Sequence, residues 1–262
     1  MKSFFRRSAT LGLIGSAILG SSLIGNLRAL ALPEQDVLAR LTPIPVFTIT
    51  DDTGAPLVAA PSGQGNDRRA VAGVFISQKN AQDFIKKLNE TNAELAKKVK
   101  VVPVSLGDVY KLNEENLKKP DGLNFAYVGV AEEQNKALEL LRQSGEKIQE
   151  FKGVPLFVAR GGEKSGYLTV QQGDKQVIPL FFEKEQLQTL IDNFKKQQPS
   201  LASTVKIEVA ELSSIIQTLK TSDDKGLNSL VLVPSREAIA FLRSLPQGNN
   251  QQSQPQQSQP RR

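Results

Sequence analysis

The sequence predicts an α/β protein with an internally duplicated β-β-β-α-β-α-β-α unit, mixed sheets and pseudo-twofold symmetry. The first observation is an internal repeat, in which sequence blocks recur in the same order about 106 residues later. The second is that short strand-like runs alternate with one-sided helical patterns, which is typical of sheets covered by helices. The third is that the second and third strands of the unit look hairpin-connected, which indicates a mixed sheet.

The repeat consists of matching blocks in the two halves of the chain. They predict a first α/β repeat over 34–143 and a second over 144–246. The pairs are VLARLTPIPVFTI from Val37 with KIQEFKGVPLFVA from Lys147, GVFISQKNAQDFIKKL from Gly73 with PLFFEKEQLQTLIDNF from Pro179, VKVVPVSLGDVY from Val99 with VKIEVAELSSII from Val205, and GLNFAYVGVAEEQNKALELL from Gly122 with GLNSLVLVPSREAIAFLRSL from Gly226.

The first half of the unit reads as three strands after a short helix. The helix near 36–41 feeds a strand around 44–50. The residues DDTG then predict a turn, because Asp and Thr favour turn positions and Gly supplies a positive φ. A second strand near 57–60, a Gly-rich loop and a third strand at 71–76 follow.

The second half of the unit alternates helices and strands. Ser77 is the expected N-cap of a helix whose apolar side chains follow the i, i+3, i+4, i+7 spacing. A Val-rich strand at 99–104, a short helix, a strand at 125–130 and a closing helix complete the unit. Since the chain contains no Cys, the fold must depend on its hydrophobic core and not on disulfides.

Residues 1–31 have the composition of a cleaved signal peptide. MKSFFRR is positively charged, SATLGLIGSAILGSSLIG is apolar, and Ala29-Leu30-Ala31 offers an A-x-A cleavage site. The alternative is a transmembrane anchor, but the run is diluted by Gly and Ser and falls short of the ~20 strongly apolar residues that a span requires. We therefore expect export, through the general route or, given Arg6-Arg7, the twin-arginine route, and a soluble mature protein without a membrane span.

Charge and composition limit the partners of the mature protein. Loss of Lys2, Arg6, Arg7 and Arg28 with the signal peptide lowers the formal net charge from +6 to +2. The remaining charges of both signs are interspersed, which indicates a solvated surface and no nucleic-acid partner. Residues 247–262 are rich in Gln, Ser, Asn and Pro, and we expect them to form a disordered tail.

One stretch, TITDDTGAPLV, raises the alternative of a carboxylate-dependent, aspartic-type hydrolase centred on Asp52. Such an enzyme needs two Asp-Thr-Gly loops, so that one carboxylate ionises while the other keeps its proton. The second repeat has RGGEKSG at the matching place and no Asp-Thr-Gly. We therefore favour a β-turn. With no His or Cys in the chain, a zinc or transition-metal site is not expected, and we expect neither a cofactor nor a catalytic residue.

Binding of apolar segments is the remaining function, and three aromatic residues are the candidates. Phe125 and Tyr127 lie on one face of a predicted strand, where the phenol suits a half-wet groove. Phe181 and Phe182 are adjacent, so they point to opposite faces of their strand. Phe182 is then either covered by a second layer or exposed as an apolar contact site.

The motifs just described resemble those of the Tic22 family, whose name comes from a small soluble component of the translocon at the inner chloroplast envelope. The marks are L-x-x-I-P-V-F-T-I-T-D, G-V-F-I-S, V-V-P-V-S-L, F-x-Y-V-G-V, V-P-L-F-V-A and P-L-F-F, between about Leu38 and Leu245. A bacterial export signal in place of a transit peptide suggests a cyanobacterial member.

The resemblance implies a non-enzymatic, chaperone-like protein-transport factor of the cyanobacterial periplasm or the thylakoid lumen. Its partners would be unfolded or precursor proteins, and the soluble domains of an Omp-eighty-five-type outer-membrane barrel protein. It would support outer-membrane biogenesis and translocation across the envelope. A purely structural envelope protein that binds no client is the remaining alternative. The family offers no short catalytic motif that could be transferred to particular residues.

Overall fold

The structure is a computed structural model of the chain, and it describes residues 12–14, 32–59, 69–162, 165–222 and 224–245. The strands form two sheets. The first contains β2 (Pro45–Asp51), β3 (Val58–Ala59), β4 (Val71–Phe75), β5 (Val99–Ser105) and β6 (Asn124–Val128). The second contains β1 (Gly12–Ile14), β7 (Pro155–Gly161), β8 (Gly166–Gln172), β9 (Lys175–Phe181), β10 (Lys206–Glu211) and β11 (Leu230–Val233).

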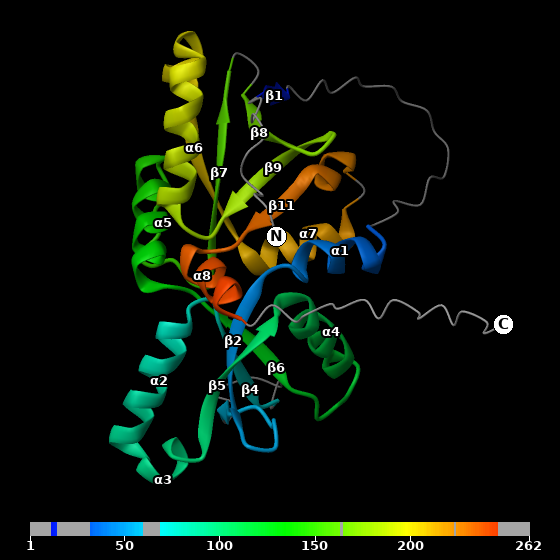
Figure 1. The fold of residues 1–262 in the computed structure, drawn as a ribbon, viewed down its shortest axis with the longest axis vertical. Coiled ribbons are helices and arrows are strands. Elements are labelled where there is room, and N and C mark those ends of the chain that lie inside the picture. Colours follow the sequence, from blue (N-terminus) through cyan, green and yellow to red (C-terminus); the bar gives the residue numbers. More distant parts are fainter. Residues whose placement is uncertain (1–11, 15–31, 60–68, 163–164, 223, 246–262) are drawn as a thin grey trace, which may run out of the picture.

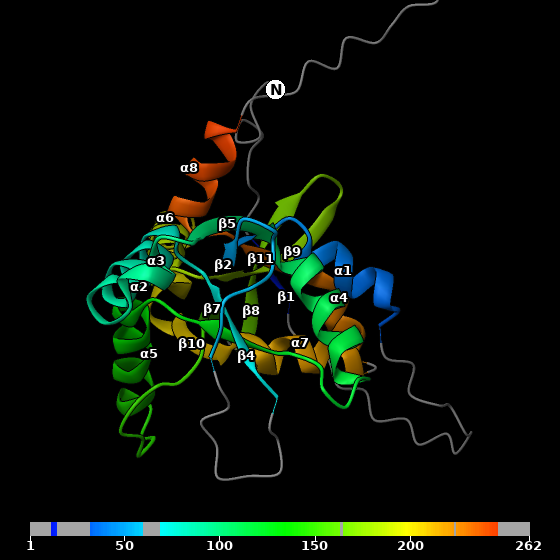
Figure 2. The ribbon, with the colours of Figure 1, turned by 90° about the horizontal axis from the view of Figure 1, so that it is seen from below.

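The helices cover both faces of this pair of sheets. Figure 2 shows α2, α3, α5 and α6 on one side, and α1, α4 and α7 on the other. The α-helices are α1 (Glu34–Leu41), α2 (Gln78–Thr91), α3 (Ala93–Ala96), α4 (Leu106–Leu117), α5 (Ala131–Gln143), α6 (Lys184–Gln197), α7 (Leu212–Thr221) and α8 (Arg236–Ser244), with 3-10 turns η1 (Pro199–Thr204) and η2 (Lys225–Ser229).

The two sheets pair their strands in a similar pattern. In the first, β2 is antiparallel to β4 and β5, while β6 is parallel to β4. In the second, β7 is antiparallel to β9 and β10, while β11 is parallel to β9. Phe47 pairs with Phe75 in one sheet, and Phe157 pairs with Phe181 in the other. The predicted mixed α/β fold is confirmed, and the internal duplication stays a prediction.

Local sequence signals placed several elements correctly. Ser77 lies in extended backbone before α2, and its side chain accepts a hydrogen bond from the Asn80 N–H, as expected for an N-cap. The strand expected at 71–76 is β4, one residue shorter. The short helix expected after the Val-rich strand is longer than predicted, because α4 runs on to Leu117.

Some residues behave differently from the sequence-based expectation or lie outside the described part. Gly12–Ile14, within the predicted signal peptide, forms β1 and pairs with β8. The rest of the 1–31 segment and the predicted tail at 247–262 lie outside the described residues. Among the residues that are described, no helix is long and apolar enough to cross a membrane.

A single central core joins the two halves of the chain. It contains Val46 and Val74 from the first sheet together with Leu156 and Leu180 from the second, and it is closed by residues of α1, α4 and α7. Its members come equally from before and after residue 144. Because burial of apolar surface is the main stabilising term, each half depends on the other for much of its stability.

The last helix of each half packs on the sheet of the other half. Ala137 of α5 packs in a cluster with Phe157 of the second sheet. Phe241 of α8 packs edge-on against Phe47 of the first sheet, with ring centroids 5.4 Å apart. Figure 1 shows α5 beside α6 along the second sheet, and Figure 2 shows α8 projecting outward from the body of the molecule. Because α5 packs on the second sheet and α8 on the first, these two helices join the halves of the chain in addition to the central core.

Candidate functional site: an apolar groove beside α4

A groove of about 570 Å³ crosses the first sheet beside α4. We call it the α4 groove. Binding pockets for small molecules usually measure roughly 300–1,000 Å³, so the α4 groove has room for a group of apolar side chains. It is lined by Thr48, Thr50, Asp51, Asp52, Thr53, Gly54, Pro56, Val74, Lys100, Val102, Val104, Asp108, Val109, Leu112, Asn116, Leu123 and Phe125.

Strand register explains the floor of the α4 groove. Thr48 pairs with Val102 on β5 and with Val74 on β4, so these three side chains share one sheet face. Phe47 and Ile49 alternate with the threonines and point to the opposite face, where they pack in the cluster that contains Ala81 of α2. The floor is therefore the face of the first sheet that α2 does not cover.

Helix α4 provides the wall. Ser105 caps the helix by accepting a hydrogen bond from the Gly107 N–H. Val109 is buried under the helix, whereas Leu112 borders the α4 groove and is 49% exposed. A Leu exposed to this degree next to an apolar hollow is available to contact another molecule.

A buried polar side chain among those lining the α4 groove has no hydrogen-bond partner in the described part of the chain. Thr50 is 6% exposed, and its Oγ1 has no hydrogen-bond partner among the described residues. The neighbouring Thr48 differs, because its Oγ1 donates to the Gly73 carbonyl at 3.3 Å. Buried polar atoms are nearly always paired in native proteins, so an unpaired hydroxyl in a groove indicates where a bound group would form a hydrogen bond.

The predicted turn closes one end of the α4 groove. The Asp51 carboxylate accepts hydrogen bonds from the Thr53 hydroxyl at 2.7 Å and from the N–H groups of Thr53 and Ala55 at 2.9 Å. These bonds, led by the one from the Thr53 hydroxyl, hold the pKa of Asp51 below its usual value. Gly54 has φ +87°, the positive value that the turn prediction required.

The environment of Asp52 is unlike that of a catalytic aspartate. Its side chain is 87% exposed, and its carboxylate lies 2.9 Å from the Lys100 ammonium. An aspartic dyad requires two close carboxylates that share a proton, but the neighbour of Asp52 is a cation. The geometry therefore agrees with the interpretation of DDTG as a turn.

The three aromatic candidates do not form one site. Phe125 lines the α4 groove and is partly buried. Tyr127, on the same strand face, packs against the central core, and burial followed by the charges of Glu114 and Glu211 raises its pKa to about 12. Phe182 is 3% exposed in the central core. The sequence left open whether Phe182 is covered by a second layer or exposed as a contact site. In the structure it is covered, because residues of both sheets and of their helices surround it. Client binding at these residues stays a prediction.

The second sheet carries a charged residue where the first has Thr50. Arg160 follows Phe157 by three residues, as Thr50 follows Phe47, and each of these phenylalanines pairs with a Phe of its sheet. The Arg160 guanidinium lies 3.3 Å from Glu208 and 4.8 Å from the centre of the Tyr167 ring, and it donates to the Ser165 carbonyl.

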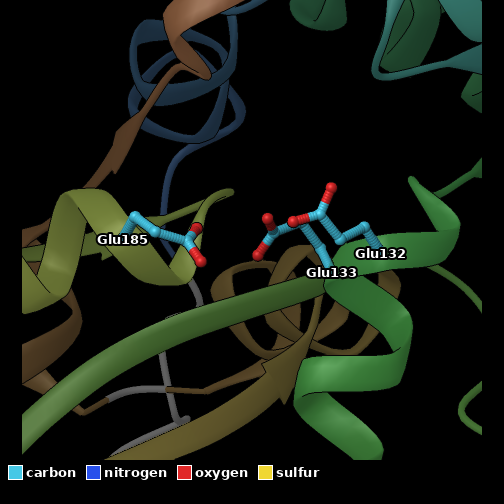
Figure 3. A group of neighbouring side chains, drawn as sticks. All are labelled: Glu132, Glu133 and Glu185. Atoms are coloured by element: carbon cyan, nitrogen blue, oxygen red, sulfur yellow. The ribbon is translucent and has the colours of Figure 1, made fainter.

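A cluster of three carboxylates joins α5 to α6 near the centre of the molecule. Figure 3 shows Glu185 reaching toward Glu133, beside Glu132. Their oxygens lie within 4.8 Å of one another, a spacing that a metal ion could use. Lys136 already supplies the cation, since its Nζ is paired with all three carboxylates, at 2.7 Å from Glu132 and 2.9 Å from Glu133.

The cluster is best understood as a structural link. Burial alone would lower the pKa of Lys136, but hydrogen bonds to its three carboxylates outweigh burial and raise it. Glu133 also accepts a hydrogen bond from the Lys184 N–H at the start of α6. Similarly, Glu237 of α8 accepts from the Lys79 N–H in the first turn of α2. Each exchanged helix thus caps a helix of the other half.

Sequence reasoning missed most of the α4 groove. It did not identify Thr50, Lys100 or Leu112, which come from two strands and a helix. The signal that could have found the floor is the alternation of Phe47, Thr48, Ile49 and Thr50, which marks one face of β2 as less apolar than the other. The wall has no comparable signal, because an exposed Leu on a helix is common.

Comparison with known proteins places the chain in a family. A profile of the family described as the Tic22-like family matches residues 7–244. The chloroplastic protein TIC 22 of Arabidopsis thaliana is 24% identical over 197 residues, covering 74% of this chain and 66% of that protein, just under two thirds of its length. The chloroplastic protein TIC 22 of Pisum sativum is 23% identical over 231 residues, covering 87% of this chain and 84% of that protein.

Solved structures agree with this relationship. Tic22 from Anabaena, described as a protein of protein transport, superposes with a TM-score of 0.72 at 34% identity, covering 82% of this chain and 98% of that one. Tic22 from Plasmodium falciparum superposes with a TM-score of 0.61, covering 79% and 95% of the two chains; at 20% identity, this likeness shows the fold alone. Since the family profile spans most of the sequence and a solved member shares the fold, the chain belongs to the Tic22-like family.

Proposed function

We propose that this chain is a protein-transport factor with chaperone-like activity, which binds apolar segments of client proteins in the α4 groove. The observation that carries the proposal is the combination, in one groove, of apolar walls, an exposed Leu112 and a Thr50 hydroxyl without a partner among the described residues. A role in protein transport is supported by the description of the Anabaena relative.

The wider setting of the proposal follows the sequence-based expectations. The chain is exported by its N-terminal segment into the periplasm or thylakoid lumen of a cyanobacterium. There it receives unfolded or precursor proteins and supports outer-membrane biogenesis, together with an Omp-eighty-five-type barrel protein. The likeness to the Anabaena structure supports a cyanobacterial origin.

Binding of an unfolded outer-membrane protein to purified variants tests the proposal. Thr50→Arg places in the α4 groove the residue that the second sheet has at Arg160, and it should abolish saturable binding. Leu112→Asp should weaken binding strongly, because a charge replaces an exposed apolar contact. Leu242→Asp is the matched control, since Leu242 is similarly exposed, at 44%, but lies on α8.

The outcomes separate the alternatives. Loss of binding in Thr50→Arg and Leu112→Asp, with normal binding in Leu242→Asp, supports the α4 groove as the client site. Equal loss in all three variants would place the site elsewhere. A wild-type protein that binds no unfolded client at all would instead favour a structural envelope protein. Far-UV circular dichroism of each variant checks that it is folded.

A further inference from the structure

The rim of the α4 groove is acidic. Asp51 and Asp52 belong to the turn at one end, and Asp108 lies in the first turn of α4. Among the described residues that line the groove, Lys100 is the only cation. The four formal charges therefore leave an excess of two negative charges around apolar walls, so the rim attracts cations and repels anions.

The charges at the turn differ in how available they are to a partner. The Asp51 carboxylate is held by the Thr53 hydroxyl and two backbone N–H groups, so it stabilises the turn while keeping its negative charge. Asp52 and Lys100 form an exposed pair, with side chains 87% and 58% accessible. Exposed pairs contribute little to stability, so another cation can replace Lys100 at Asp52 at low cost.

The floor supplies an independent indication of a ligand. Thr50 is one of the residues that line the groove, it is more than nine-tenths buried, and its hydroxyl has no partner among the described residues. Thr50 is adjacent to Asp51 in the chain, so this hydroxyl lies toward the same end of the groove as the turn. A peptide group of a segment lying in the groove would satisfy it, which a purely hydrocarbon ligand could not do.

We propose that the α4 groove selects polypeptide segments in which apolar residues are flanked by Lys or Arg. The apolar side chains lie between the sheet and α4, a peptide group bonds the Thr50 hydroxyl, and the basic residue displaces Lys100 from Asp52. This inference rests on the proposed client binding and adds a preference for basic flanking residues, which we call the charge rule. Lys100 then acts as a competitor of the client, so its removal should strengthen binding of basic segments.

Three synthetic peptides test the charge rule on the full chain. They share one Leu- and Val-rich core and carry two Lys, two Gln or two Glu residues at each end. In low salt the Lys peptide should bind about two- to five-fold more tightly than the Gln peptide, the gain of an exposed ion pair, and the Glu peptide should bind more weakly. Added salt should reduce these differences and leave binding of the Gln peptide nearly unchanged.

Two variants of neighbouring residues should act with opposite sign. Asp52→Asn should reduce the preference for the Lys peptide over the Gln peptide, and Lys100→Gln should increase it about two-fold or more. Binding of the Gln peptide is measured on each variant, and the change for the Lys peptide is expressed relative to it. Both side chains are exposed, and Asp51, which holds the turn, stays in place, so both variants should fold.

The outcomes of the peptide experiment distinguish the two proposals. If the three peptides bind equally to the wild type, or if Lys100→Gln weakens binding of the Lys peptide, the charge rule is wrong and client binding in the groove stands. If none of the peptides binds, the groove is not a client site and both proposals fail. The expected order, with opposite effects of the two variants, supports the charge rule.

Discussion

The unpaired hydroxyl of Thr50 allows a prediction in which stability and function change in opposite directions. A buried hydroxyl without a partner costs about 1–3 kcal/mol. Thr50→Val removes the hydroxyl and keeps the β-branched shape that a central strand favours. The free energy of unfolding should therefore rise by about 1–3 kcal/mol, which raises Tm by about 2–4 °C per kcal/mol in a chain of this size.

Thr48→Val is the matched control on the same strand and in the same groove. Its hydroxyl donates to the Gly73 carbonyl, so its removal should lower stability by about 0.5–1.5 kcal/mol. Urea denaturation followed by circular dichroism measures both variants. Client affinity should nevertheless fall about two- to ten-fold in Thr50→Val, because the bound segment loses a hydrogen bond. A less stable Thr50→Val protein, or equal shifts in both variants, would refute the reasoning.

Three further predictions concern the turn, the Lys136 cluster and the halves of the chain. Gly54→Ala should lower the free energy of unfolding in urea by about 1–2 kcal/mol, because φ is +87°. Nothing lies within 4 Å of an added Cβ, so the cost comes from the backbone conformation and not from a clash. Asp52→Asn should change the free energy of unfolding by less than about 0.5 kcal/mol. The pKa of Glu185 is lowered from its ordinary value of 4.5. The contribution of Glu185 to the free energy of unfolding should therefore be present above pH 4.5 and be lost as the pH falls below that value. The pKa of Lys136 is raised, so its contribution to the free energy of unfolding should persist up to about pH 10.5 and be lost at higher pH. Thermal melts across pH check both the acid and the alkaline loss of stability, and Lys136→Met should lack the alkaline loss. Fragments 34–143 and 144–245 should each fail to fold, because they share the central core; a cooperative transition of either fragment alone would contradict this.

Local signals in the sequence were reliable wherever neighbouring residues decide the conformation. Ser77 caps α2 because its side chain reaches an N–H three residues away. Gly54 forms the turn because its own backbone tolerates a positive φ. The interpretation of Asp52 as a turn residue, and not as a catalytic aspartate, also needed only the comparison of DDTG with its counterpart in the second half of the sequence.

Short helices and edge pairings were less predictable. Helix α3 has only four residues and follows α2 after a single residue, so its apolar pattern merges with that of its neighbour. The pairing of β1 with β8 joins residues more than 150 positions apart. Sequence periodicity contains no information on which edge such a short strand will choose.

The sequence by itself determined the class of the fold, the order of its elements, the turn at DDTG and the family. These features depend on periodicity, on turn chemistry and on motifs, all of which are local. Only the tertiary structure decided that α5 and α8 exchange sheets, that Phe182 is enclosed and that Thr50, in the α4 groove, has no partner among the described residues. The physical reason is that burial and hydrogen-bond satisfaction depend on groups from several elements, some as distant in the sequence as Phe47 and Phe241, whose position follows from packing the whole chain.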